Sequence, residues 1–268
     1  MFFVRRAENL LLRAEEKEIP ALPGDLDGLK IGFVSDIHFG CFFGPERVRE
    51  LCEKIAAESP DLLLFGGDYG EDGPAAAEFW KMAAGMVRAP FGVYAVPGNH
   101  DSRECADPAL LENSVRSAGA RMLENNAVRI KRGNSVLAVC GTGDCYRDNA
   151  DMDRLEVLSR GADICLLLTH SPDVLPDYFA AHPTPFFQLV LCGHTHGGQV
   201  ALFGRPLKPS SKYGSRYVSG WKKENGVDIL VSSGVGTTFM PIRLGTWPEY
   251  HMITLKREKR TDTAGPRR

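Results

Sequence analysis

The chain has 268 residues, of which 43% are hydrophobic and 25% are charged, so it can fold into one large or two small globular domains. Its net charge of −2 excludes the global positive charge typical of nucleic-acid-binding domains. No apolar run in the sequence approaches the roughly 18–20 residues that a membrane-spanning helix requires.

The first 27 residues form a segment of their own, in which two short apolar clusters are separated by charges. This pattern is too broken for a secretory signal. It predicts a short amphipathic helix, which would lie on a membrane surface or pack on its own domain, followed by a turn-rich lead-in. We expect one domain over residues 28–256 and a basic polar tail over residues 257–268.

The seven cysteines include no CxxC pair, so the sequence does not support a zinc ribbon or a thioredoxin-like motif. Cys140, Cys165 and Cys192 lie in apolar, strand-like runs, where free cysteine behaves as a small buried hydrophobe. Unpaired cysteines favour a reducing compartment and therefore the cytoplasm.

Short apolar runs alternate with helix-like stretches from residue 31 onward, which indicates an α/β domain. In chain order, we predict strands at 31–35, 62–65, 93–96, 136–140, 164–169, 188–192, 229–232 and 251–255. The predicted helices cover 45–58, 75–86, 108–117 and 152–160. The second half is richer in strands and turns, which favours a mixed sheet or a two-sheet sandwich.

Polar residues with metal-binding or proton-transfer chemistry follow five of these strands. One HxH alone is more often an incidental turn, but five of the seven histidines fall at these strand ends. In open α/β sheets, ligands bind beyond the carboxyl ends of the strands, so we expect one shared site. The residues are Asp36, His38, Asp68, Asn99, His100, Asp101, His170, His194 and His196.

Apart from His100 and Asp101, these residues make seven candidate nitrogen and oxygen ligands, which is more than one ion usually takes. Two divalent ions that share a bridging carboxylate fit better, because such a pair can clamp the attacking and leaving oxygens of a displacement. Imidazole and carboxylate ligands without thiolate favour manganese, with zinc, iron or cobalt as alternatives.

The motifs DxH (36–38), GD (67–68), GNHD (98–101), a single histidine (170) and GHTH (193–196) occur in this order. With this set the chain resembles the calcineurin-like metallophosphoesterase superfamily. The resemblance implies an α/β fold of the α+β type, a two-sheet mixed β-sandwich flanked by helices. It also implies a dinuclear metallophosphoesterase that cleaves phosphodiester or pyrophosphate bonds by a metal-bridged hydroxide.

The resemblance gives each matching residue a role. Asp36, His38 and His196 would bind the first ion, and Asp68 would bridge both ions. Asn99, His170 and His194 would bind the second ion. His100 would lie near the phosphate and stabilise its charge or protonate the leaving oxygen. Asp101 would either orient His100 or cap a following helix.

The form GHTHGGQ (193–199) and the long loop after it resemble a bacterial branch of the superfamily. That branch includes membrane- or cell-wall-associated phosphodiesterases and UDP-2,3-diacylglucosamine pyrophosphatases of lipid A biosynthesis. A lipid-linked phosphoester or pyrophosphate is therefore one candidate substrate, with peripheral contact at the inner membrane face. The alternatives are a phosphomonoesterase on the same site and a non-catalytic metal-binding scaffold.

The loop over residues 202–221 places cations beside aromatic rings, which suits an anionic substrate with an apolar part. From it we take Arg205, Tyr213, Arg216 and Tyr217 as candidate substrate-binding residues. A packed surface loop explains the same composition. Two alternatives are open for Phe39, Phe42 and Phe43: they line the acyl side of a lipid-linked substrate, or they belong to the hydrophobic core.

Overall fold

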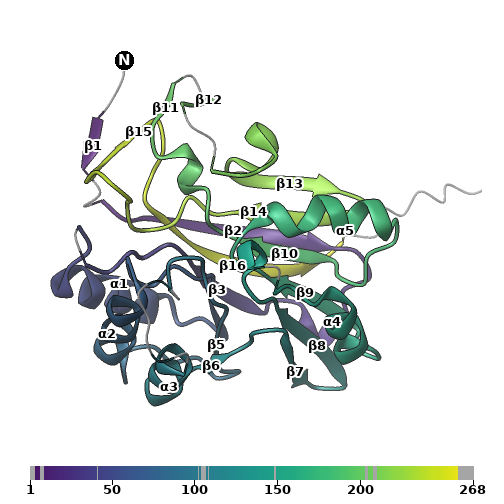
Figure 1. Cartoon of the computed structure of the whole chain (residues 1–268). Helices are drawn as coiled ribbons and strands as arrows, with labels where there is room; N and C mark the ends of the chain where they lie inside the picture. Colours follow the sequence, from purple (N-terminus) through teal and green to yellow (C-terminus); the bar gives the residue numbers. More distant parts are fainter. Residues whose placement is uncertain are drawn as a thin grey trace, which may run out of the picture.

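The computed structural model describes residues 4–6, 9–40, 42–101, 103, 107, 109–147, 149–202, 205–207 and 210–258. Two six-stranded mixed sheets pack face to face, and helices cover the outer side of each (Figure 1). The predicted fold class, a two-sheet sandwich flanked by helices, is therefore confirmed.

The first sheet has the strand order β2-β16-β3-β4-β5-β6. Its strands are β2 (Leu11–Ile19), β16 (Glu249–Arg257), β3 (Lys30–Val34), β4 (Leu62–Phe65), β5 (Val93–Ala95) and β6 (Arg121–Met122). Strands β3, β4, β5 and β6 run parallel, so the carboxyl ends of β3, β4 and β5 meet at one edge. The helices α1 (Pro45–Glu58), α2 (Gly73–Ala83) and α3 (Leu110–Ser117) pack on its outer face.

The second sheet has the order β13-β14-β10-β9-β8-β7. Its strands are β13 (Gly220–Glu224), β14 (Val227–Val231), β10 (Leu189–Cys192), β9 (Ile164–Leu168), β8 (Ser135–Gly141) and β7 (Asn126–Arg132). Strands β8, β9, β10 and β14 are parallel. The helices α4 (Met152–Ser159) and α5 (Leu175–Ala181) cover its outer face.

Successive side chains of a strand point to opposite faces of its sheet, so one apolar strand contributes to two separate parts of the core. In β9, Ile164, Leu166 and Leu168 enter the core between the sheets, whereas Cys165 and Leu167 pack under the helices. This period of two buries both faces of a central strand, which is why such strands read as continuous apolar runs.

Two small two-stranded sheets lie outside the sandwich. One pairs β1 (Val4–Arg6) with β15 (Ile242–Leu244), and the other pairs β11 (Ala201–Leu202) with β12 (Arg205–Pro206). Short 3-10 helices also mark several loops, among them η2 (Cys145–Arg147), η3 (Pro172–Val174), η4 (His196–Gly198) and η5 (Gly214–Tyr217).

The helix expected within residues 1–27 is wrong for residues 11–19, which form β2. In β2, exposed Ala14, Glu16 and Glu18 alternate with less exposed neighbours, and the whole strand pairs in parallel with β16. Pairing with a distant strand therefore overrides the local helical pattern. Phe2 and Phe3, on which that expectation also rested, lie outside the described residues, as does most of the tail over 257–268.

Candidate metal centre

The expected site residues lie in the loops that follow five parallel strands of the two sheets. Asp36 and His38 follow β3, Asp68 follows β4, and Asn99 and His100 follow β5. From the second sheet, His170 follows β9, and His194 and His196 follow β10. The sandwich thus brings the carboxyl ends of two separate sheets together at one edge.

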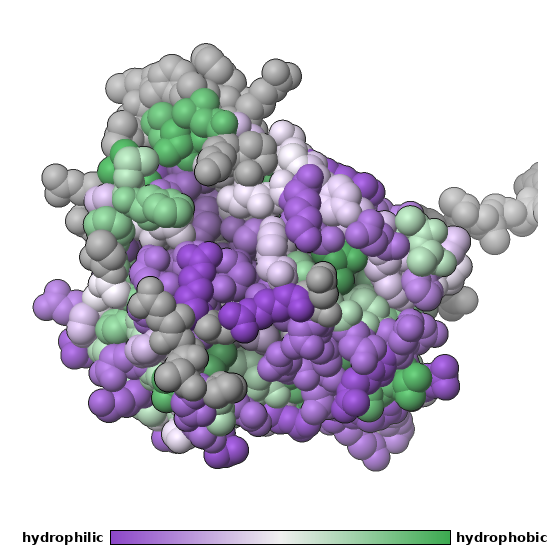
Figure 2. Space-filling view, in the orientation of Figure 1, coloured by the Kyte–Doolittle hydropathy of each residue, from purple (hydrophilic) through white to green (hydrophobic). Residues whose placement is uncertain are grey.

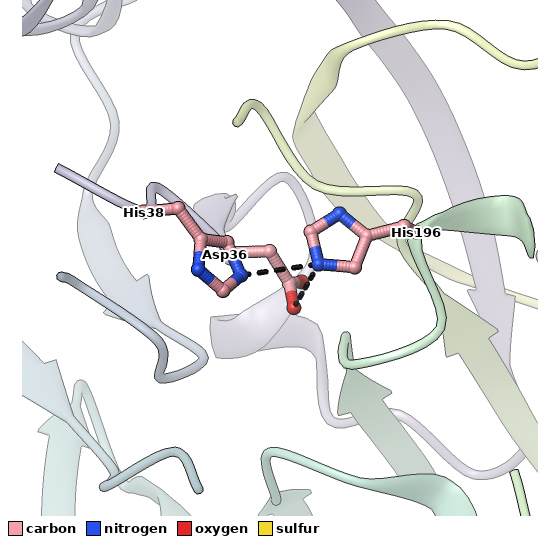
Figure 3. A group of neighbouring side chains, drawn as sticks. All are labelled: Asp36, His38 and His196. Carbon is pink, nitrogen blue, oxygen red and sulfur yellow. Dashed lines mark hydrogen bonds and ion pairs between the residues drawn. The ribbon is translucent and has the colours of Figure 1, made fainter. Parts of the chain in front are cut away.

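The first group of side chains consists of Asp36, His38 and His196 (Figure 3). The imidazole Nε2 atoms of His38 and His196 lie 3.1 Å apart, and the Nε2 of His196 lies 3.7 Å from Oδ1 of Asp36. All three side chains are buried and point toward one another, so their ring nitrogens and carboxylate could converge on one cation.

Asp68 lies between this group and a second one. Its Oδ2 atom is 3.5 Å from Nε2 of His38 and 3.3 Å from Nε2 of His170. Its Oδ1 atom accepts a hydrogen bond of 2.8 Å from the backbone N–H of His100. One carboxylate oxygen therefore faces imidazoles of both groups, which is the position that a shared ligand would take.

The second group contains His170, Asn99 and His194. The Nε2 atom of His170 lies 3.1 Å from Oδ1 of Asn99 and 3.2 Å from Nδ1 of His194. The other ring nitrogen of His170 lies 2.8 Å from the carbonyl oxygen of Gly66. A carbonyl only accepts, so this contact places the His170 proton on Nδ1 and leaves Nε2 free to bind a cation.

The backbone at the site adopts a conformation that side-chain-bearing residues rarely take. Asp36, His38, Asp68, His194 and His196 all have φ between 49° and 72°. Each such residue costs on the order of 1–3 kcal/mol, and strain of this kind clusters at functional sites. At Gly193, any Cβ would overlap the carboxylate of Asp36, so only glycine permits this approach of the two loops.

Burial controls the charge of the imidazoles. It lowers the pKa of His38 to about 3 and that of His194 to about 4, and it holds the pKa of His196 well below its ordinary value. For His170, burial acts in the same direction, but the charge of Asp68 prevails and raises the pKa to about 10. Burial also raises the pKa of Asp36 to about 6.

These properties fit a divalent cation. Neutral imidazole is the metal-binding form of histidine, and three of the four ligand histidines have depressed pKa values. The buried Nδ1 of His38 makes no hydrogen bond and lies 3.6 Å from Oε1 of Glu71. The described residues offer three overlapping sets of ligand atoms that could hold an ion: Asp36, His38 and His196; His38, Asp68 and His100; and Asp36, Asp68 and His170.

His100 is half-buried beside this cluster, with its ring in edge-on contact with His38. Its Nδ1 atom lies 3.2 Å from the carbonyl oxygen of Glu71 and 3.0 Å from Nη1 of Arg103. Since a ring nitrogen of His100 also falls within reach of the ligand atoms of His38 and Asp68, geometry alone permits it to be a ligand as well as a proton donor.

The carboxylate of Asp101 accepts hydrogen bonds from backbone N–H groups of two loops. It accepts hydrogen bonds from the N–H groups of Asp68 at 2.9 Å, Tyr69 at 2.7 Å and Gly98 at 2.8 Å. These bonds join the loops after β4 and β5, so Asp101 holds the loops of Asp68 and Asn99 together. These hydrogen bonds go neither to His100 nor to the start of a helix, and the segment that Asp101 was expected to cap lies partly outside the described residues.

The expected substrate-binding residues have other partners. Arg216 forms an ion pair of 2.9 Å with Glu224, and the Tyr217 hydroxyl donates to the same carboxylate at 2.6 Å. The hydroxyl of Tyr213 donates to Asp177 at 2.9 Å. The side chain of Arg205 lies outside the described part. Phe43 is in the core under α1, and Phe39 packs against that core.

Sequence reasoning missed three residues that contact the site. The Tyr146 hydroxyl lies 2.8 Å from Nε2 of His194 and donates to Asp173 at 2.7 Å. Arg243 is fully buried and lies 3.5 Å from Nδ1 of His196. Its guanidinium donates to backbone carbonyls of His196, Ser233, Gly234, Gly236 and Trp247. Asp173 had one local signal, its place three residues after His170, whereas Arg243 had none.

Comparisons with known proteins agree with this architecture. The family model of the calcineurin-like phosphoesterases matches residues 29–198. YkuE of Bacillus subtilis, an uncharacterized metallophosphoesterase, is 29% identical over 265 residues, which cover 95% of this chain and 89% of YkuE. The phosphodiesterase YaeI of Escherichia coli is 31% identical over 238 residues, which cover 84% of this chain and 82% of YaeI.

Among solved structures, a dimetal phosphatase from Danio rerio has the same fold, with a TM-score of 0.52 at 12% identity. The match covers 85% of this chain and 99% of that protein. In the part of the chain that the structure describes, every helix is too short or too polar to cross a membrane.

Proposed function

The chain belongs to the calcineurin-like phosphoesterase family, whose members are metal-dependent hydrolases, and on this premise we propose that it cleaves phosphodiester or pyrophosphate bonds with two metal ions. The observation that carries the proposal is the position of Asp68, whose Oδ2 atom is 3.5 Å from His38 and 3.3 Å from His170. A carboxylate shared between two ligand groups is what a pair of ions requires.

In this proposal each group holds one ion. Asp36, His38 and His196 would hold the first ion, Asn99, His170 and His194 would hold the second, and Asp68 would be shared by both. When bound, the two ions supply Lewis-acid polarisation of the phosphoryl oxygens and a nucleophile that is active near neutral pH. Imidazole and carboxylate ligands suit manganese, and zinc, iron or cobalt would also be accepted.

His100 is the proton donor in this proposal. Nδ1 of His100 lies between the carbonyl oxygen of Glu71 at 3.2 Å, which only accepts, and Nη1 of Arg103 at 3.0 Å, which only donates, and these two contacts hold the ring and direct Nε2 away from Glu71. For this role Nε2 must carry a proton when substrate binds, and the negative charge of the phosphate would favour that protonated form against the burial that lowers the pKa of His100. The Arg103 guanidinium, with Nη1 3.0 Å from Nδ1 of His100, adds a positive charge that attracts a phosphate.

Two observations favour a diester over a monoester. YaeI, which is 31% identical to this chain, is named a phosphodiesterase. The sequence GGDY at 66–69 lacks the longer GDxxDRG form of protein phosphatases. From the resemblance of GHTHGGQ (193–199), we further propose that the chain is a member of the bacterial branch with membrane- or cell-wall-associated phosphodiesterases.

We extend the proposal to an amphiphilic substrate, for which UDP-2,3-diacylglucosamine is one model. Figure 2 shows apolar surface gathered over the region of β11, β12 and β15. The exposed large hydrophobic residues next to these strands are Leu207, Met240 and Phe239, and Phe239 is 91% exposed. Such side chains could contact an acyl chain or a membrane surface.

Hydrogen bonds on either side of Phe239 join its loop to two segments that carry candidate ligands. Gly236 of this loop donates its N–H to the carbonyl oxygen of Asp36 at 2.7 Å. The amide of Gln199, the last residue of GHTHGGQ, binds the backbone of Thr238 and Met240 at 2.7–3.2 Å. Because three residues span at most about 11 Å, Phe239 lies within that distance of Gly236.

The reaction is tested with an activated diester and the matching monoester that carries the same leaving group. The protein is stripped with chelator, manganese is returned, and Asp68→Asn serves as the control. We expect manganese to restore diester cleavage at a higher kcat/KM than monoester cleavage. A preference for the monoester would replace the proposal with a phosphomonoesterase, and no turnover of either substrate would favour a non-catalytic scaffold.

The amphiphilic substrate is tested with Phe239→Ser. We expect slower cleavage of a diacyl phosphodiester in micelles and unchanged cleavage of the small soluble diester. Val157→Ser is the matched control, because Val157 is 54% exposed on α4 of the other sheet. If both variants cleave the diacyl substrate at the wild-type rate, Phe239 does not contact the acyl chains. If the wild type itself does not cleave the diacyl substrate, the lipid-linked substrate is ruled out.

A further inference from the structure

We propose that Tyr146 and Asp173 are positioning residues that fix the imidazole of His194 and couple it to the segment 210–212. The proposal rests on the proposed function, because it gives His194 a metal to bind. It adds two residues outside the ligand motifs, one from η2 (Cys145–Arg147) and one from η3 (Pro172–Val174).

The three side chains form a continuous chain of contacts. The hydroxyl oxygen of Tyr146 lies 2.8 Å from Nε2 of His194 and 2.7 Å from Oδ2 of Asp173. The Tyr146 and His194 rings also pack together, with centroids 4.9 Å apart. Tyr146 thus contacts His194 through both its hydroxyl and its ring.

The proton inventory gives these bonds a direction. The Nδ1 atom of His194 faces His170, at 3.2 Å from its Nε2, so Nδ1 is the nitrogen that points into the centre. If Nδ1 binds a cation, the His194 proton must lie on Nε2, where it donates to the oxygen of Tyr146. Tyr146 has one hydroxyl proton, and Asp173 at 2.7 Å is a closer acceptor for it than the carbonyl oxygen of Ser210 at 3.4 Å. Asp173 therefore selects the tautomer of His194 through Tyr146.

Asp173 also holds the segment 210–212. Asp173 is buried, with 5% of its surface exposed. Its carboxylate accepts a hydrogen bond from Oγ of Ser211 at 2.5 Å and one from the N–H of Lys212 at 2.9 Å. The ammonium of Lys212 lies 5.0 Å above the Tyr146 ring. The same carboxylate thus binds the long loop after GHTHGGQ and the residue that orients His194.

The position of Asp173 in the chain explains the arrangement. Asp173 follows His170 by three residues, in the loop after β9, and its N–H donates to Oγ of Ser171 at 3.2 Å. One strand end therefore supplies both a ligand of the second group and the carboxylate that orients another ligand. A displacement of the segment 210–212 would be transmitted to His194 through two hydrogen bonds.

The test is Tyr146→Phe, which removes the hydroxyl and keeps the ring packed on His194. We titrate chelator-stripped protein with manganese and follow free and bound ion by electron paramagnetic resonance. Loss of an outer partner of a metal-binding histidine typically weakens affinity by about 10–100-fold. We expect that loss for the second ion only, with the first ion bound as in wild type. A merely structural role would not separate the two ions.

Two further variants keep the test decisive. Asp173→Asn should weaken the second ion by a similar factor, and the double variant should be no weaker than either single variant, since both act through one chain of bonds. Tyr213→Phe is the control, because its hydroxyl binds Asp177 instead. If Tyr146→Phe binds both ions as tightly as wild type, this inference is wrong. If wild-type protein itself fails to bind two ions, the proposed function fails instead.

Discussion

The two halves of the metal centre differ in how they are held. Asp36 and His38 of the first half are completely buried, and His196 is 6% exposed against the buried guanidinium of Arg243. In the second half His170 is buried, but Asn99 and His194 are only half-buried, and the neighbouring Tyr146 is 37% exposed. One half is thus enclosed by the fold, and the other reaches the surface.

The two halves of the candidate metal centre are also held in place by different contacts. Left-handed backbone occurs in both halves, at Asp36, His38 and His196 and also at His194, but the enclosed half is in addition held by the hydrogen bonds of the buried Arg243. The open half is fixed by side-chain hydrogen bonds through Tyr146 and Asp173. We therefore expect substrate to approach from the open half and stability to depend on the enclosed half.

The largest effect is expected where the halves meet. Asp68→Asn removes the negative charge that both groups share, so turnover of the diester should fall by at least about 10³-fold. The fold should persist, because the carboxylate lies at a strand end and not in the apolar core. The measurement is kcat/KM at saturating manganese, with circular dichroism as the control for folding. Near wild-type turnover would show that the two groups do not share a ligand.

His100→Ala distinguishes a proton donor from a ligand on the open side. We expect a rate loss of about 10²–10⁴-fold, the usual size of a general-acid contribution. The manganese content, measured by elemental analysis of the purified variant, should equal that of wild type. A variant that has lost an ion would mean that His100 binds metal, as its distance to His38 and Asp68 permits.

Arg243→Met tests the enclosed half through stability. The substitution removes every hydrogen bond that Arg243 gives to the loops around His196, and an unpaired buried polar group costs about 1–3 kcal/mol. We expect the free energy of unfolding in urea to fall by at least about 3 kcal/mol. Arg216→Met, which breaks an exposed ion pair with Glu224, should cost less than about 1 kcal/mol. If both substitutions lowered the free energy of unfolding by the same amount, Arg243 would stabilise the protein no more than a surface arginine does.

The smallest effect concerns backbone strain. His38 has φ of 49°, so in chelator His38→Gly should be more stable than His38→Ala by about 1 kcal/mol. His170 is not among the described residues with positive φ, so there glycine should be the less stable of the two by about 0.5–1 kcal/mol. Thermal unfolding of the four variants gives the comparison. The same order at both positions would argue against strain at His38.

The sequence predicted which candidate ligands would lie together better than it predicted the residues that position them. Asp36, His38 and Asp68 lie two to four residues after the ends of apolar strands, and the fold brings parallel strand ends together, so their meeting could be expected from their positions in the sequence. Arg243 acts through carbonyls in distant loops, and no local pattern marks such a contact. Tyr146 also meets His194 only through tertiary structure.

The same limit applies to the fold. Helix α1 could be predicted within its observed bounds, because Val48, Leu51, Cys52 and Ile55 recur at helical spacing and all four are buried. Strand β2 could not, because its charged sequence becomes a strand only by pairing with β16 at the other end of the chain. In the loop after GHTHGGQ, Arg216 and Tyr217 could not be distinguished from substrate ligands until Glu224 was seen to bind both.

The most direct test of a two-ion phosphodiesterase is a manganese titration of chelator-stripped protein, with ions bound per chain and diester turnover measured on the same samples. The account predicts two ions per chain and turnover that rises as the second ion binds. Saturation at one ion, or diester turnover that persists in chelator, would contradict it.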